Sequence, residues 1–167
     1  MGGIIGAVLV SAPITRGVLA RAKRLRGRRL WLMLPNDLLE DAVRFHGHLG
    51  PFLVLGLRAG LLATEYLGKS YFELKARVET ASHPPQSCFI DGVQFASGCT
   101  TGKCNLTVEV GSNVSAEFIR GERSIRLAVQ DNILRALDNL SSEEQVEKMS
   151  SELIRKPDDE VFVIRRD

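Results

Sequence analysis

Apolar positions recur along this chain with two different periods, and the change of period predicts where helices and strands lie. Residues 37–45 carry apolar side chains at helical spacing behind a capping residue, Asp37. Residues 51–67 are apolar nearly all round, begin at Pro51 and end before Gly68, which indicates a helix in the core. Gly56 and Gly60 lie four apart on one face of it, so we expect another backbone to approach closely there.

Strand-like alternation follows from residue 74 onward. Residues 74–81 alternate as a strand, and residues 87–96 predict a short helix capped by Ser87. The runs LTVEV, VSAEFI and SIRLAV are separated by GSN and RGER turns, which predicts an antiparallel meander. Residues 131–140 and 142–155 are expected to be helical, and VFVI predicts a closing edge strand. This order does not alternate as in a doubly wound sheet, so the predicted class is α+β, with antiparallel strands in a mixed sheet.

The first 34 residues differ from the rest in charge. Residues 1–36 hold seven basic residues and no acid, whereas the remaining 15 basic and 20 acidic residues give −5. The apolar run at residues 4–14 is shorter than the ~20 residues of a membrane span and precedes the basic residues, unlike a secretory signal. We predict a disordered basic head at 1–34, arising from a start assigned upstream of Met33, and one domain at 35–167. Contact of the head with nucleic acid or an anionic membrane is the alternative; we expect neither partner.

Composition is that of an ordinary globular domain, with 44% apolar and 25% charged residues. Three cysteines are an odd number and too few for a disulfide framework. Such usage is typical of a reducing compartment, so we expect a cytoplasmic protein.

Two of the three histidines stand in FHGHLGP, at the predicted end of the first helix. Gly47 can adopt backbone angles that direct the rings of His46 and His48 toward one point, and imidazole is a common metal ligand. The alternative is that one histidine caps the helix while the other packs in the core. The residues alone leave these two interpretations open.

The cysteines are Cys88, Cys99 and Cys104, all in a stretch rich in glycine, serine and threonine rather than in apolar strands. That setting favours metal ligands over small buried hydrophobes, the usual role of free cysteines. Cys88 begins the predicted helix at 87–96, so the helix dipole is expected to lower its pKa. Asp91 and Gln94 lie on the same helix, where they could orient a metal-bound histidine or water.

The stretch SGCTTGKCN is not a nucleotide-binding P-loop. Gly98 and Gly102 enclose three residues rather than four, and Cys104 stands where a hydroxyl is needed. Backbone N–H groups and Lys103 could still bind an anion there.

FHGHLGPFLVLGLRAG and SCFIDGVQFASGCTTGKCNL together resemble the FmdE family, whose name comes from a component of formylmethanofuran dehydrogenase. The family's pattern is an HGH, a C-x-x-D-x-x-Q element and GCT-x-GKGN, and the resemblance runs from about Asn36 to the C-terminus. It implies an α+β core of helix–strand–helix plus three strands, a homodimer, and zinc or another divalent transition metal. The implied metal ligands are His46, His48, Cys88 and Cys99, and the implied cleft residues are Asp91, Gln94, Thr100, Lys103 and Asn105.

The resemblance implies a metal-binding protein, acting as a metal-dependent enzyme or redox protein related to molybdenum or tungsten formylmethanofuran dehydrogenase. The alternative is a non-catalytic accessory or metal-delivery subunit of a molybdenum or tungsten oxidoreductase. Two positions depart from the pattern: Gly50 replaces a cysteine often found after the HGH, and Cys104 replaces the glycine of GKGN. Whether Cys104 supplies the missing thiol stays open at this point.

Overall fold

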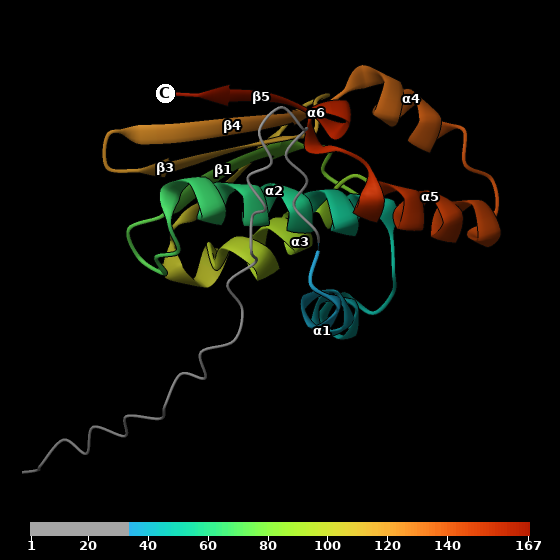
Figure 1. The fold of residues 1–167 in the computed structure, drawn as a ribbon, viewed down its shortest axis with the longest axis horizontal. Coiled ribbons are helices and arrows are strands. Elements are labelled where there is room, and N and C mark those ends of the chain that lie inside the picture. Colours follow the sequence, from blue (N-terminus) through green and yellow to red (C-terminus); the bar gives the residue numbers. More distant parts are fainter. Residues whose placement is uncertain (1–33) are drawn as a thin grey trace, which may run out of the picture.

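The computed structural model describes residues 34–167, so the predicted head at 1–34 lies almost entirely outside the described residues. Within this part a mixed five-stranded sheet has helices packed on one face, as Figure 1 shows, which confirms the α+β class. The helices and strands in chain order are α1 (Asn36–His46), α2 (Pro51–Leu67), β1 (Lys75–Thr80), α3 (Cys88–Ser97), the 3-10 helix η1 (Thr101–Lys103), β2 (Leu106–Val110), β3 (Ser115–Arg120), β4 (Arg123–Val129), α4 (Asp131–Asp138), α5 (Glu143–Arg155), α6 (Asp158–Val161) and β5 (Phe162–Arg166).

The strand order is β2-β1-β3-β4-β5, which corrects one prediction from the sequence. β2 does not form a hairpin with β3; it pairs with β1 in parallel, while β3 pairs with the other side of β1. The chain therefore crosses the end of β1 at residues 111–114, where Gly111 N–H donates to the Thr80 carbonyl at 3.0 Å. α3 connects β1 to β2, and such a crossover helix makes its two strands parallel. The expected hairpin of β3 and β4 and the edge strand β5 are confirmed.

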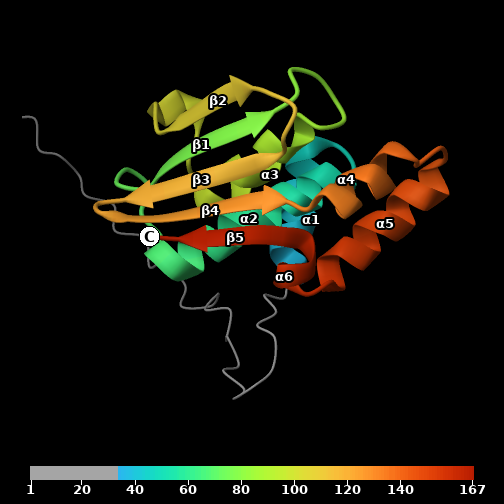
Figure 2. The ribbon, with the colours of Figure 1, turned by 90° about the horizontal axis from the view of Figure 1, so that it is seen from above.

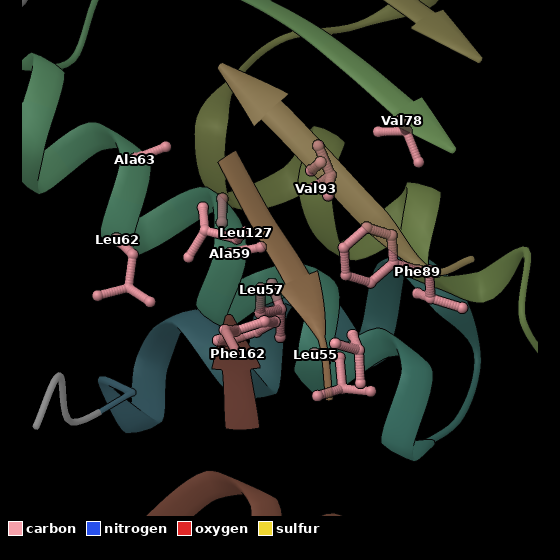
Figure 3. Close-up of a cluster of buried hydrophobic side chains, with 14 of the residues drawn as sticks. Leu55, Leu57, Ala59, Leu62, Ala63, Val78, Phe89, Val93, Leu127 and Phe162 are labelled. Carbon is pink, nitrogen blue, oxygen red and sulfur yellow. The ribbon is translucent and has the colours of Figure 1, made fainter. Parts of the chain in front are cut away.

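The core lies between the sheet and α2, the helix that is apolar nearly all round. Every second residue of β1 is buried, and these residues face the helical layer. Figure 3 shows this contact, with Leu57 and Ala59 of α2 near Leu127 of β4 and Phe162 of β5. Phe89 of α3 completes this core.

α2 and α3 approach each other through glycines, as the spacing of Gly56 and Gly60 predicts. A Cβ atom added at Gly56 would lie 2.9 Å from the Val93 backbone nitrogen, and one at Gly60 2.8 Å from Ala96 Cβ. Gly92 of α3 completes the contact from the other side, since its added Cβ would lie 2.6 Å from the Leu57 nitrogen. The two helix backbones are therefore in direct contact, which fixes α3 relative to α2.

A buried charge anchors the C-terminal helices to α2. Arg58 has only 1% of its surface exposed, and its guanidinium donates to the Leu153 carbonyl of α5 and to the Asp158 carboxylate of α6. A guanidinium without such partners would be very costly to bury. The Arg58 ion pair thus ties the end of α5 and the start of α6 to the middle of the core helix.

Candidate functional site

The first part of the site is the turn that ends α1. Gly47 has φ +99°, the left-handed region, and its N–H donates to the Val43 carbonyl at 2.7 Å. A left-handed residue reverses the chain direction after a helix, and glycine adopts it without steric cost. The rings of His46 and His48 consequently lie side by side, with centroids 4.6 Å apart and planes inclined by 38°. The two imidazole rings are therefore adjacent, as the glycine between them predicts.

His46 is held by a carboxylate from α3. Its Nδ1 lies 2.8 Å from Oδ2 of Asp91, and its side chain is only 7% exposed against 37% for Asp91. In the neutral ring, an Nδ1–H that donates to the carboxylate leaves the lone pair on Nε2. That Nε2 is buried and has no hydrogen-bond partner among the described residues. An oriented histidine with a buried, unpartnered nitrogen is typical of a metal ligand with a carboxylate behind it.

Cys88, at the start of α3, is partly buried and presents the third candidate donor. Burial raises the pKa of the Cys88 thiol, and the negative charge of Asp91 raises it further. The net shift is thus opposite to the lowered pKa that the position at the helix start predicted. Desolvation of the thiolate and the carboxylate three residues away outweigh the backbone hydrogen bond that lowers this pKa.

A pocket of about 290 Å³, which we call the histidine pocket, opens beside His48 and Cys88 and is mostly apolar. The lining includes His48 and Cys88 together with Leu137 of α4, Leu140 of the α4–α5 connection and Val146 of α5. Gly50, Pro51, Phe52 and Pro85 complete it. A wider hollow of about 540 Å³ adjoins it, shares His48, and is bordered by Glu143 and Glu147. The histidine turn therefore faces an apolar chamber with a polar approach.

The wall of this pocket could not be found from the sequence. Leu137, Leu140 and Val146 belong to the predicted C-terminal helices and their connection, and no local pattern indicates that they enclose a site.

Gly50 lies close to one of the histidines, because a Cβ at this position would lie 3.3 Å from Nε2 of His48. A cysteine there, as in the family pattern, would therefore stand next to the histidines.

The remaining predicted site residues lie at the other end of α3 and serve the fold. α3 has 10 residues and spans about 15 Å, so Cys99 beyond its C-terminus is separated from Cys88 at its start. Cys99 is fully buried in the core, where its thiol donates to the Leu74 carbonyl at 3.3 Å. The resemblance implied that Cys99 lies together with His46 and His48. The structure instead places Cys99 in the core beyond the far end of α3.

Gln94, Thr100, Lys103 and Asn105 hold together the loop after α3. Gln94 accepts from the Thr101 N–H, Thr100 accepts from the Lys103 N–H, and Lys103 donates to the Gly98 carbonyl. Asn105 donates to the carbonyls of Tyr71 and Leu74, and its Oδ1 accepts from the Thr100 N–H. These four side chains are engaged with backbone groups and are not placed in the histidine pocket.

Cys104 follows the loop and is exposed. Its φ is +56°, a left-handed conformation that a glycine adopts more readily, which accounts for the glycine of the family pattern. Because it lies in the loop after α3, it does not replace the thiol missing at Gly50.

The described residues contain no set of three or more His, Cys, Asp or Glu side chains already placed to hold a metal ion. None of the helices between residues 34 and 167 is both long and apolar enough to cross a membrane.

Comparison with known families decides the relationship. Residues 45–163 match the family described as "FmdE, Molybdenum formylmethanofuran dehydrogenase operon", which covers both sequence blocks and most of the described fold. The chain belongs to the FmdE family. A solved structure of a tungsten formylmethanofuran dehydrogenase FmdE-like protein from Syntrophus aciditrophicus shares this fold, with a TM-score of 0.56 and 20% identity over 78% of this chain and 70% of that one.

One curated relative is a probable S-adenosyl-L-methionine-binding protein of Archaeoglobus fulgidus. It is 32% identical in an alignment of 123 residues, which covers 71% of the present chain and 33% of the relative. This FmdE-family chain therefore spans about a third of that relative's length.

Proposed function

We propose that this FmdE-family protein binds a divalent transition metal, zinc or a similar ion, through His46, His48 and Cys88. The observation that carries the proposal is the state of His46: Asp91 holds Nδ1 at 2.8 Å, while the buried Nε2 has no partner among the described residues. Leaving a buried ring nitrogen without a partner costs free energy, and a metal ion would supply that partner.

The donor chemistry fits such a metal. Two imidazole nitrogens and one thiolate suit zinc and other borderline ions, and three protein ligands leave a fourth position open. Completing the set requires His48 and Cys88 to turn toward Nε2 of His46, because the described residues hold no preformed three-ligand cluster. Binding also requires the Cys88 thiol to lose its proton. Since burial and Asp91 raise the pKa of that thiol, metal affinity is expected to increase with pH.

The apolar pocket indicates what approaches the open position. At about 290 Å³ it accepts a small molecule, and the walls of Leu137, Leu140 and Val146 would exclude water from it. A bound metal would supply a Lewis acid at the end of this chamber. We propose that the protein is a metal-dependent enzyme or redox protein acting on a small, largely apolar ligand, and that it works as a homodimer in the cytoplasm.

The family description favours one alternative, in which the site binds metal without turnover. Because the FmdE family is described by a molybdenum formylmethanofuran dehydrogenase operon, the protein would then be an accessory or metal-delivery subunit of a molybdenum or tungsten oxidoreductase. Purification of the natively expressed protein separates the two functions: recovery with a large oxidoreductase supports the accessory role, and isolation as a separate homodimer supports the first.

Zinc titration of the chelator-treated full chain tests the metal site. We expect one high-affinity site in the wild type and its loss in His46→Gln and Cys88→Ser. Asp91→Asn, which removes only the orienting carboxylate, should weaken binding by about 10–100-fold. The matched controls are His83→Gln and Cys104→Ser, at an exposed histidine and an exposed cysteine outside the site. Unchanged zinc binding in both His46→Gln and Cys88→Ser would refute the proposal.

A further inference from the structure

The face of the sheet opposite the helices is uncovered by any helix of the described chain, as Figure 2 shows. Over most of this face, charged side chains on neighbouring strands neutralise one another. Arg77 of β1 lies 3.3 Å from a carboxylate oxygen of Glu109 on β2 and 3.9 Å from one of Glu117 on β3. Such alternating pairs are the ordinary way to solvate an open sheet face.

One end of this face departs from the pattern. A hollow of about 650 Å³ lies where the end of β4, the start of β5 and α4 meet, and three arginines line it: Arg126, Arg135 and Arg165. We call it the arginine hollow. Its lining includes a single carboxylate, that of Asp131.

The positive charge of the arginine hollow is largely uncompensated. Arg126 faces Glu79 at 3.6 Å, but no carboxylate of residues 34–167 lies within ion-pair distance of Arg135 or Arg165. In addition, Arg126 and Arg165 are directly opposite each other in the β4–β5 register. Like charges at directly opposed positions of a sheet destabilise it. An anion bound between them would convert this repulsion into attraction.

The surroundings indicate the kind of anion. Ala128 of β4 and Val163 of β5, the next directly opposed pair on the same face, form an apolar floor beside the arginines, and Val163 is half exposed. Guanidinium groups bind phosphate oxygens in a bidentate manner, and the hollow is large enough for a molecule of nucleotide size. A phosphate would lie against the arginines and an apolar or ring-shaped body against the floor.

We propose that the arginine hollow is a binding site for a small phosphorylated molecule. Arg126 and Arg165 bind the phosphate from adjacent strands, and Arg135 reaches it from α4. None of these residues lines the histidine pocket, so the result of a phosphate-binding test does not depend on the proposed metal site.

Calorimetric titration of the full chain with ADP and inorganic pyrophosphate, with adenosine as the uncharged comparison, tests the proposal. We expect both phosphates to bind and adenosine not to bind. Arg165→Gln and Arg135→Gln should each weaken ADP binding about tenfold or more, since each removes a hydrogen bond between charged groups. Both side chains are exposed, so neither change should impair folding, which circular dichroism verifies.

Arg77→Gln is the matched control, because it removes the same charge from the same sheet face outside the arginine hollow. Arg77 lies two strands from Arg126 in the register, about 10 Å away. Arg77→Gln should leave ADP affinity within about twofold of the wild type, since exposed charges farther than a Debye length of about 8 Å are screened at physiological salt. Absence of ADP and pyrophosphate binding at millimolar concentration would overturn the proposal. An equal loss of affinity in Arg77→Gln and Arg165→Gln would also overturn it, because binding would then follow net charge alone.

Discussion

Replacing Gly92 by alanine tests whether the close contact of α2 and α3 sets both stability and the geometry of the histidine site. The new Cβ would lie 2.6 Å from the Leu57 nitrogen and closer still to the Leu53 carbonyl oxygen, both backbone atoms of a buried helix. Contacts of about 3.5 Å or more are needed for favourable packing, so the helices must separate by about 1 Å. Alanine gains about 1 kcal/mol of helix propensity, whereas overpacking against a rigid neighbour costs up to about 3 kcal/mol. We therefore expect a net loss of about 2 kcal/mol.

Urea unfolding followed by circular dichroism measures this loss as a change in the free energy of unfolding. Gly102→Ala is the matched control, since nothing lies within 4 Å of its added Cβ and its backbone is not left-handed. Zinc affinity should fall in Gly92→Ala and not in Gly102→Ala, because Asp91 and Cys88 move with α3 while the histidines precede α2. A Gly92→Ala protein as stable as the wild type would refute the assignment of a rigid helix contact.

Three further changes test other parts of the structure. Gly50→Cys, whose Cβ would lie 3.3 Å from Nε2 of His48, should raise zinc affinity in the same titration; unchanged affinity would contradict the placement of the metal beside His48. Arg58→Ala should destabilise the fold by about 3–5 kcal/mol in urea, because it leaves the buried carboxylate of Asp158 without its guanidinium, and a loss below about 1 kcal/mol would contradict this. Partial desolvation, and next the charge of Asp158, raise the pKa of the exposed Glu65 carboxyl above its ordinary 4.5, so the folded state binds this proton more tightly and loses stability as pH rises through that raised pKa. The free energy of unfolding of Glu65→Gln should therefore increase relative to that of the wild type between pH 4 and pH 7. A difference between the two proteins that does not change with pH would show that the pKa of Glu65 is not raised.

The local elements were predictable because their causes are local. The period of apolar residues located α2, the glycine pair Gly56 and Gly60 indicated its close neighbour, and Gly47 indicated the turn that brings the histidines together. Each of these depends on the backbone freedom or spacing of residues within one or two turns of chain. The α+β class and the edge position of β5 followed from the order of elements.

Other features depended on which segments meet, and the sequence could not specify them. Strand-like alternation is the same whatever the partner, so the pairing of β2 with β1 rather than β3 is set only once α3 packs on α2 and directs the crossover. The motif residues near 88 and 99 looked like one cleft, but the length of α3 places Cys99 in the core, while Cys88 lines the same pocket as His48.

The chemistry of the site divides in the same way. The residue types in FHGHLGP and the cysteine at 88 determined that nitrogen and sulfur donors are present, since that depends on composition alone. Only the tertiary structure decided that Asp91 orients His46, that its other ring nitrogen is buried without a partner among the described residues, and that the Cys88 pKa rises rather than falls. Burial and the proximity of charges are properties of the packed chain, and at Cys88 they shift the pKa in the direction opposite to the one that its sequence position suggested.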